Sequence, residues 1–384
     1  MGEVVQIVGG GTPDSSNADY WDGDIDWYTP SEIGERRSVE TSARKITPEG
    51  LVHSSARLLP AGSILFTSRA SIGLMAFISR PSATNQGFQS LVPSNNVDSN
   101  FLYALGPYIS RYAKKHAAGS TFIEISGSSL AKAPLRIPSL AEQRRIGEFF
   151  SALDGLIAAA ERQEALLKQK KQAYLQLMFP QEGETQSRLR FAGFSGDWEK
   201  RQLGELAERT GSGGTPSSAN PRYYGGSIPF LSIGDITGRF VDTTQKTLTE
   251  EGLTNSAAWV VPQGAISLAM YASYGKSAIL SRPMATSQAF FNVVFTSDAT
   301  RDFIYSRFQC AEVRHEWDAM VSTGTQPNLS GSKLKKWEIS LPPLPEQRLI
   351  GQFFKTFDSL IAAAEERTRA LKETKSAYLQ RMFV

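Results

Sequence analysis

The chain has 384 residues, which is enough for two domains of ordinary size with full hydrophobic cores. Its formal net charge is only +3 and its single cysteine is Cys310, which argues against a stand-alone nucleic-acid binder and excludes an internal disulfide. No apolar run approaches the length of about 18 residues that a membrane helix needs, and the N-terminus lacks a signal-peptide pattern, so the sequence predicts a soluble, cytoplasmic protein.

Residues 1–137 are predicted to form the first globular domain. The domain opens with Gly9-Gly10-Gly11-Thr12-Pro13 and continues into an aromatic and acidic stretch over residues 20–28. Short β-rich runs follow at residues 63–66 and 74–78, bounded by Gly and Pro. This pattern favours a domain built mainly from short strands.

Residues 138–180 and 342–384 are predicted to form two long helices of nearly the same sequence. Residues 138–179 align with 342–383 at a constant offset and without a gap, and more than half of the paired positions are identical. Ser139 with Glu142 gives a capping-box pattern, Pro345 suits a first helical turn, and Pro180 ends the first copy. About 40 residues at ~1.5 Å each predict a rod of about 60 Å.

An apolar row spaced by seven residues runs along each predicted helix, whereas a second row is apolar only at its ends. The alternative is a helix packed only on its own domain, but a duplicated heptad row favours the two copies packing on each other. Because the first helix leads into the second domain, the pair is predicted to be antiparallel, with Ile146 opposite Tyr378, Leu153 opposite Leu371, and Ala160 opposite Ala364 at the middle. The predicted core of the helix pair is Ile146, Leu153, Ala160, Leu167, Tyr174, Ile350, Phe357, Ala364, Leu371 and Tyr378.

Residues 181–190 are predicted to be a polar linker, and residues 191–341 repeat the plan of the first domain. Gly213-Gly214-Thr215-Pro216 matches the first Gly-Thr-Pro, and Ser273-Tyr274-Gly275 matches Ser71-Ile72-Gly73. The second domain has a lead-in over residues 189–205 that the first lacks, so the first strand of the chain is expected to be shorter or to be completed by neighbouring chain. Glycines and prolines recur between the domains while polar loop residues differ, which is typical of a protein that reads two different targets.

With both repeats in view, the chain resembles the specificity subunit of Type I restriction-modification systems over essentially its whole length. The resemblance rests on the paired Pro-x-Leu-x-Glu-Gln openings at Pro138 and Pro342, the two Gly-Thr-Pro starts, and the Ser-x-Gly loops at Ser71 and Ser273. It implies two target-recognition domains that each read one half of a split double-stranded DNA target. It also implies that the helices set the spacing of the half-sites and bind the methyltransferase (modification) subunits, which restriction (nuclease-translocase) subunits join.

The sequence contains no complete motif of the enzyme classes that its short patterns resemble. Asn220-Pro221-Arg222-Tyr223 lacks the second proline of an amino-methyltransferase motif, and Gly275-Lys276-Ser277 lacks the glycine that a phosphate-binding loop needs at position 270. A nuclease of the Asp…Asp/Glu-x-Lys type would need that triplet on a strand, but the only Glu-x-Lys lies inside the second long helix. Three scattered histidines and one cysteine do not have the spacing of a zinc site. The sequence therefore predicts a non-catalytic subunit with no cofactor and no metal.

Candidate DNA contacts lie in matched loops, because base reading needs directed donors and acceptors. Arg69 could pair with guanine, with a surface salt bridge as its alternative. Gln86 and Gln288 are candidates for shared phosphate or scaffold contacts, Thr121 and Thr325 for phosphate contacts, and Gln326 and Asn328 for base contacts or simple turn residues. The full set is Thr12, Ser68, Arg69, Ser71, Gln86, Thr121, Thr215, Tyr271, Ser273, Tyr274, Lys276, Gln288, Thr325, Gln326 and Asn328.

The predicted fold class is α+β, with two tandem β-rich recognition domains, two long antiparallel helices and an internal pseudo-two-fold repeat. The predicted function is DNA recognition within a Type I restriction-modification complex. Two alternatives stay open, a part of a DNA methyltransferase enzyme and a coiled-coil scaffold that binds only protein.

Overall fold

The two repeated segments form the longest helices of the computed structural model, α5 (Leu140–Met178) and α10 (Leu344–Phe383), with 39 and 40 residues. The structure describes residues 1–34, 36–119, 123–322 and 328–383. The Ser139 hydroxyl accepts the Glu142 N–H at 3.4 Å at the start of α5, and Pro345 lies in the first turn of α10. α5 lies within residues 138–180 and α10 within residues 342–384.

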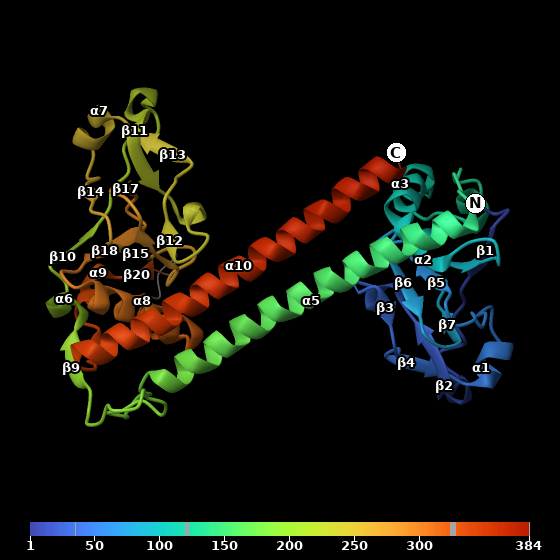
Figure 1. Cartoon of the computed structure of the whole chain (residues 1–384), viewed down its shortest axis with the longest axis horizontal. Helices are drawn as coiled ribbons and strands as arrows, with labels where there is room; N and C mark the ends of the chain where they lie inside the picture. Colours follow the sequence, from blue (N-terminus) through green and yellow to red (C-terminus); the bar gives the residue numbers. More distant parts are fainter. Residues whose placement is uncertain (35, 120–122, 323–327, 384) are drawn as a thin grey trace. The chain divides into compact units, whose positions relative to one another are not determined.

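The chain divides into two compact units, Met1–Ala160 with Thr368–Val384, and Glu161–Arg367. The division falls inside both long helices. Each unit therefore contains one β-rich domain together with a stretch of α5 and a stretch of α10 (Figure 1).

Unit 1 contains a five-stranded sheet in the order β1-β8-β5-β6-β3 and a three-stranded sheet in the order β4-β2-β7. Most pairs are antiparallel, but β3 is parallel to β6 and β2 is parallel to β7. The strands are β1 (Val5–Gly9), β2 (Trp21–Tyr28), β3 (Ser38–Val39), β4 (Arg44–Ile46), β5 (Ile64–Phe66), β6 (Met75–Ile78), β7 (Ser82–Thr84) and β8 (Gln89–Pro93). The helices are α1 (Pro48–Val52), α2 (Ser99–Ala104), α3 (Gly106–His116) and α4 (Gly127–Ala131), with 3-10 turns at Ala18–Tyr20 and Pro30–Glu32.

The five-stranded sheet of unit 1 is buried on both faces. Ile64 and Phe66 of β5 face a core with residues of α2, α3 and α4, whereas Leu65 between them faces a second core against Tyr28 of β2. Successive side chains of a strand point to opposite faces, so an apolar run without alternation is what a strand buried on both sides requires.

Unit 2 repeats this topology, with sheets in the orders β10-β18-β15-β16-β12 and β13-β11-β17-β14. Its strands are β9 (Glu199–Gln202), β10 (Arg209–Ser212), β11 (Tyr224–Leu231), β12 (Phe240–Val241), β13 (Lys246–Leu248), β14 (Val260–Val261), β15 (Ile266–Ala269), β16 (Ser277–Leu280), β17 (Met284–Thr286), β18 (Phe290–Val294), β19 (Val321–Ser322), β20 (Asn328–Leu329) and β21 (Glu338–Leu341). Its helices are α6 (Leu203–Leu206), α7 (Glu250–Thr254), α8 (Asp298–Val313) and α9 (Gly331–Lys335), with 3-10 turns at Pro221–Tyr223, Ile233–Asp235 and Glu316–Ala319. The predicted fold class, α+β with two repeated β-rich domains and long helices, is confirmed.

The start of the chain decides between the two expectations stated for it. β1 has five residues and β10 has four, so the first strand is not shortened. The ammonium group of Met1 donates to the Ala133 carbonyl at 2.7 Å, and the Gly2 N–H donates to Ala131. The end of α4 and the segment after it therefore hold the first residues of the chain. This agrees with the expectation that neighbouring chain completes the start of the first domain.

Within each unit the stretches of α5 and α10 run antiparallel. In unit 1, Lys375 of α10 pairs with Asp154 of α5 at 2.6 Å, and in unit 2 Lys171 of α5 pairs with Asp358 of α10. The register of α10 against α5 differs from the prediction. The prediction places Tyr378 opposite Ile146, but Tyr378 packs edge-to-face on Phe149, which lies about one turn after Ile146 in α5. Buried Phe150, Ile157 and Met178 of the second row widen the apolar face, so one heptad row alone does not decide the register.

The predicted helix core is buried unevenly. Leu153, Ala160, Ile350 and Ala364 are buried, whereas Tyr378 is 43% exposed, which corrects its assignment to the core. The remaining members, Ile146, Leu167, Tyr174, Phe357 and Leu371, are half-buried. Ala160 belongs to unit 1 and Ala364 to unit 2, so their mutual contact stays a prediction.

Candidate nucleic-acid interface

Two loops with the same backbone join the middle strands of the five-stranded sheets, β5 to β6 in unit 1 and β15 to β16 in unit 2. Ala70 has a φ of 58° and Ala272 a φ of 57°, both in the left-handed region that costs energy for a side chain with a Cβ. Gly73 and Gly275 follow at φ 94° and 89°. Backbone strain at the same point of both copies makes these loops candidates for a functional role, because strain persists only where surrounding structure imposes it.

Each loop is held by two neighbouring segments. The Ser68 N–H donates to the Gly87 carbonyl at 2.8 Å, and the Ser68 carbonyl accepts the Ile125 N–H at 3.0 Å. Three segments that are distant in sequence therefore meet at one end of the sheet. The same two bonds join Met270 to Ala289 and Leu329 in unit 2, at 2.7 and 3.0 Å.

The Gly-Thr-Pro segment near the start of each domain also lies at this end of the sheet. The exposed Thr12 hydroxyl donates to the side-chain oxygen of Gln86 at 2.5 Å, and Thr215 donates to Gln288 in the same way in unit 2. All four residues were predicted as candidates, and the structure joins them in matched pairs. Among the described residues, the amide nitrogen of neither glutamine has a hydrogen-bond acceptor.

Arg69 and Ser71 lie on the loop of unit 1, half-buried and exposed respectively. Arg69 passes close to the Gly87 backbone, since a Cβ at Gly87 would lie 3.3 Å from Arg69 Nε. Within the described part of the chain, Arg69 has no carboxylate at salt-bridge distance, which disfavours the salt-bridge alternative. The matched residues of unit 2 are Tyr271, half-buried, and Ser273, exposed.

Three predicted contacts are bound to other residues of the protein. Ser68 is fully buried and its hydroxyl donates to Glu124 at 3.0 Å, which corrects its assignment as a DNA contact. The Tyr274 hydroxyl donates to Asp318 at 2.9 Å. This hydrogen bond and the negative charge of Asp318 raise the pKa of Tyr274. Asn328 lies in β20, paired with the backbone of Ser322, and is half-buried. Thr121, Thr325 and Gln326 lie outside the described residues.

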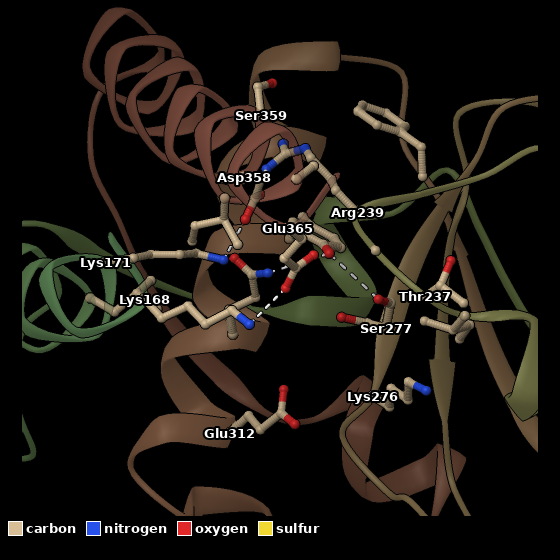
Figure 2. A pocket seen from close by; sticks show the side chains of 18 of the residues that line it. Lys168, Lys171, Thr237, Arg239, Lys276, Ser277, Glu312, Asp358, Ser359 and Glu365 are labelled. Atoms are coloured by element: carbon tan, nitrogen blue, oxygen red, sulfur yellow. Dashed lines mark hydrogen bonds and ion pairs between the residues drawn. The ribbon is translucent and has the colours of Figure 1, made fainter. Parts of the chain in front are cut away.

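Lys276 lines a groove of unit 2. The groove lies between the second β-rich domain and the local stretches of α5 and α10, and it is lined on the helix side by Lys168, Lys171, Asp358 and Glu365 (Figure 2). Burial raises the pKa of Glu312, which lines the same groove. Lys276 is therefore a weaker candidate for base contact than Tyr271.

A buried carboxylate distinguishes the three-stranded sheet of unit 1 from the matched sheet of unit 2. The side chain of Asp26 is fully buried and accepts Arg80 Nε at 2.5 Å and the Ser42 N–H at 3.0 Å. Burial disfavours the charged form, but the hydrogen bonds from Ser42, Arg80 and Thr41 outweigh it, so the pKa of Asp26 lies below its ordinary value of 3.8. Pro229 takes the place of Asp26 in the matched strand pair of unit 2, opposite Thr247.

Sequence reasoning missed a set of charged residues where each domain meets the helices. These are Arg37, Asp154 and Lys375 in unit 1, and Arg239, Asp358 and Lys171 in unit 2. A signal was present, because both aspartates and both lysines occupy matched positions of the duplicated helices.

The family model for the Type I restriction modification DNA specificity domain matches residues 1–169 and 195–373, which is most of the chain in two copies. The chain belongs to this family. The two matches each combine one β-rich domain with most of the following long helix, which agrees with the internal repeat.

Two curated relatives of this specificity-domain family are similar to parts of the chain. The Type I restriction enzyme MjaIX specificity subunit of Methanocaldococcus jannaschii is 37% identical over 170 residues, 43% of this chain and 39% of that protein. The EcoR124I/EcoR124II specificity subunit of Escherichia coli is 33% identical over 186 residues, 45% of each protein. The matched part therefore spans less than half the length of either relative.

A solved structure shares the fold. The S subunit of a Type I restriction-modification system from M. genitalium matches with a TM-score of 0.65 and 13% identity, over 100% of this chain and 94% of that one. Across the described residues, no helix has the length and apolarity to cross a membrane, and no group of three or more candidate metal ligands is found.

Proposed function

We propose that this chain is the DNA-recognition subunit of a Type I restriction-modification complex and that each β-rich domain reads one half of a split double-stranded target. The observation that carries the proposal is the pair of strained loops at Ala70 and Ala272, which have the same backbone and different side chains. Arg69 stands where Tyr271 stands in the other unit, so two domains of one design would recognise different bases.

The matched residues beside the two loops suit phosphate or sugar contacts. Thr12 with Gln86 and Thr215 with Gln288 present the same hydroxyl and amide groups in both units. Such groups fix the position of a protein on a duplex without reading sequence. Arg69 and Tyr271 differ in chemistry and are the candidates for base contact, whereas Ser71 and Ser273 are the same residue at the matched position and suit a shared contact.

The helices would set the spacing of the two half-sites and bind methyltransferase subunits, with restriction subunits completing the assembly. A net charge of only +3 supports a shared grip on DNA, because a chain that neutralised many phosphates alone would carry more Lys and Arg. Methylation and cleavage would reside in the partner subunits, and this chain would need no cofactor.

Mapping methylated adenines in the host genome, with and without this gene, tests the proposal. We expect a split target whose two halves differ in sequence, lost on deletion. A continuous target would contradict the two-reader arrangement. Methyl-donor binding by the isolated chain would instead favour a methyltransferase, and failure of the chain with its methyltransferase partner to retain the mapped duplex over a scrambled one would favour a scaffold that binds only protein.

A further inference from the structure

The same three-residue bridge occurs in both units, where a recognition domain meets the helices. In unit 1, Asp154 Oδ2 accepts Arg37 Nη1 at 2.5 Å and Asp154 Oδ1 accepts Lys375 Nζ at 2.6 Å. In unit 2, Asp358 Oδ2 accepts Arg239 Nη1 at 3.0 Å and Asp358 Oδ1 pairs with Lys171 (Figure 2). Each carboxylate thus gives one oxygen to the domain and the other to the opposite helix.

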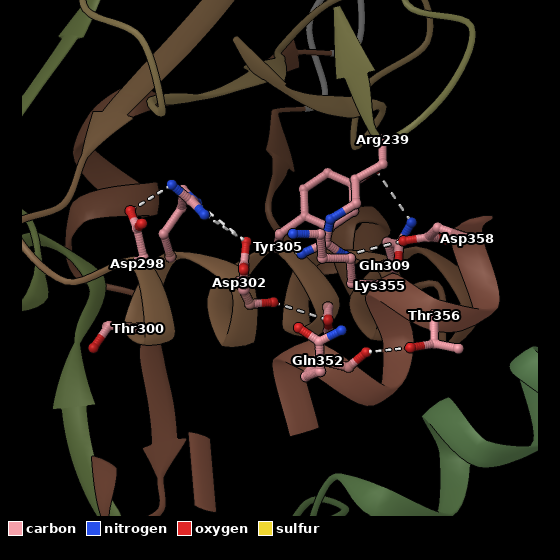
Figure 3. Close-up of polar contacts among 12 residues, drawn as sticks. Arg239, Asp298, Thr300, Asp302, Tyr305, Gln309, Gln352, Lys355, Thr356 and Asp358 are labelled. Atoms are coloured by element: carbon pink, nitrogen blue, oxygen red, sulfur yellow. Dashed lines mark hydrogen bonds and ion pairs between the residues drawn. The ribbon is translucent and has the colours of Figure 1, made fainter. Parts of the chain in front are cut away.

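The arginine of each bridge is fixed within its own domain by a second set of contacts. Arg37 Nη2 donates to Asn100 at 2.7 Å, and its guanidinium lies 4.5 Å from the ring centre of Tyr103. Arg239 Nη2 donates to Asp302 at 2.9 Å, and its guanidinium lies 4.5 Å from the ring centre of Tyr305 (Figure 3). A planar guanidinium held by stacking and by two acceptors has little freedom to turn, so it fixes the place of the carboxylate.

The backbone of each arginine is joined to the strand that leaves the candidate reading loop. The Arg37 carbonyl accepts the Phe77 N–H of β6 at 2.8 Å, and the Arg239 carbonyl accepts the Ile279 N–H of β16 at 2.8 Å. β6 and β16 begin directly after the loops that contain Ala70 and Ala272. A short, hydrogen-bonded path therefore runs from each reading loop through an arginine to both helices.

A glycine two turns before each aspartate brings α5 or α10 close to the domain. A Cβ at Gly147 would lie 2.8 Å from the Asn100 Cβ, and one at Gly351 would lie 2.8 Å from the Asp302 Cβ. Real Cβ atoms do not approach so closely, so both contacts require glycine. The residues at these contacts, Asn100 and Asp302, are the ones that hold the arginines.

We infer that the bridges Arg37–Asp154–Lys375 and Arg239–Asp358–Lys171 are positioning elements that fix the angle of each reading domain on the helix pair, and thereby the DNA spacer length that the complex accepts. The inference rests on the proposed function. The bridge residues read no base. They act through the strands that carry the reading loops, so their loss should change spacing and leave each half-site unchanged.

The test uses the full chain with its methyltransferase subunits and duplexes that carry both mapped half-sites, with spacers varied one base pair at a time. A carboxamide has one acceptor oxygen and cannot bind both cations, so Asp154→Asn and Asp358→Asn should each lower the preference for the natural spacer over its neighbours by about fivefold or more. The order of preference for bases within each half-site should not change.

Lys168→Met is the matched control. Lys168 pairs with Glu164 of its own helix and with Glu365 of α10, both at 2.7 Å, so its loss loosens the helix pair without touching the arginine of the domain. Its spacer preference should equal that of the wild type. An equal loss in Lys168→Met would overturn the inference, because any loosening of the helices would then suffice.

Arg37→Lys and Arg239→Lys provide a second pair of variants that keep the positive charge and lose the two-acceptor geometry. They should also weaken spacer preference, and they decide the matter if the asparagine variants fail to fold. A lower melting temperature with wild-type spacer preference would show a purely structural role and overturn the inference. A wild-type complex without any split target would refute the proposed function itself, which separates the two failures.

Discussion

The two units differ most at the loops that end their central strands and least where they join the helices. Arg69 of unit 1 stands where Tyr271 stands in unit 2, whereas the arginine, aspartate, lysine and glycine that join each domain to the helices are the same in both. The residues of the attachment are therefore shared by the two units, whereas the candidate reading loops differ at Arg69 and Tyr271.

A second difference lies in buried charge. Asp26 is buried in unit 1 and Pro229 replaces it in unit 2, whereas Glu346 is buried in unit 2 and its counterpart in the helix repeat, Glu142, is exposed. Arg190, from the predicted linker, forms a two-bond pair with Glu346 at 2.7 and 2.8 Å. Arg190 of the predicted polar linker is thus bound to the first turn of α10.

The largest expected effect follows from this pair. Glu346→Gln should destabilise the chain by about 3 kcal/mol, because Arg190, with a side chain only 10% exposed, would keep its charge without a counter-ion. Glu142→Gln, at the matched exposed position, should change stability by less than about 0.5 kcal/mol. Urea unfolding of both variants measures the difference, and equal effects would contradict the assigned asymmetry.

Ala160→Leu should overpack the helix pair and cost roughly 1–3 kcal/mol, because Ala160 is only 3% exposed. Ala364→Leu, 7% exposed at the matched position, should have a similar effect. Thermal unfolding is the measurement. An unchanged melting temperature in either variant would count against close packing of the helices at that alanine.

Arg69→Ala should weaken binding of the mapped duplex by about 1–3 kcal/mol and relax base preference in one half-site only. Tyr271→Ala should affect the other half-site, since it stands at the matched place in the other domain. Binding of a panel of duplexes with single base changes separates these outcomes. A uniform loss for all sequences would assign Arg69 to a phosphate contact.

Asp26→Asn should cost on the order of 1–2 kcal/mol near neutral pH, because hydrogen bonds to a buried charge are lost. The pKa of Asp26 is lowered on folding, so its contribution is present above about pH 3.8 and is lost as the pH falls through the lowered folded value. The variant should therefore approach the wild type in stability at low pH. A constant difference across an acid titration would show that packing rather than charge is responsible.

The sequence by itself determined the duplication, the two long helices and the β-rich character of each domain. Cap residues, apolar periodicity and matched glycines are local signals, and each acts within a few residues of its own position. The sequence also brought forward Thr12, Gln86, Thr215 and Gln288, although as single candidates rather than as hydrogen-bonded pairs.

Only the tertiary structure decided which polar side chains face solvent and which bind one another. Ser68 and Tyr274 are polar loop residues like Ser71 and Ser273, yet their hydroxyls bind Glu124 and Asp318 within the protein. The partners of Asp154 and Asp358 lie far away in sequence, and their pairing depends on the register of two helices. The register of α5 against α10 results from packing along the whole length of both helices. A heptad row in the sequence therefore predicts this register only to within about one helical turn.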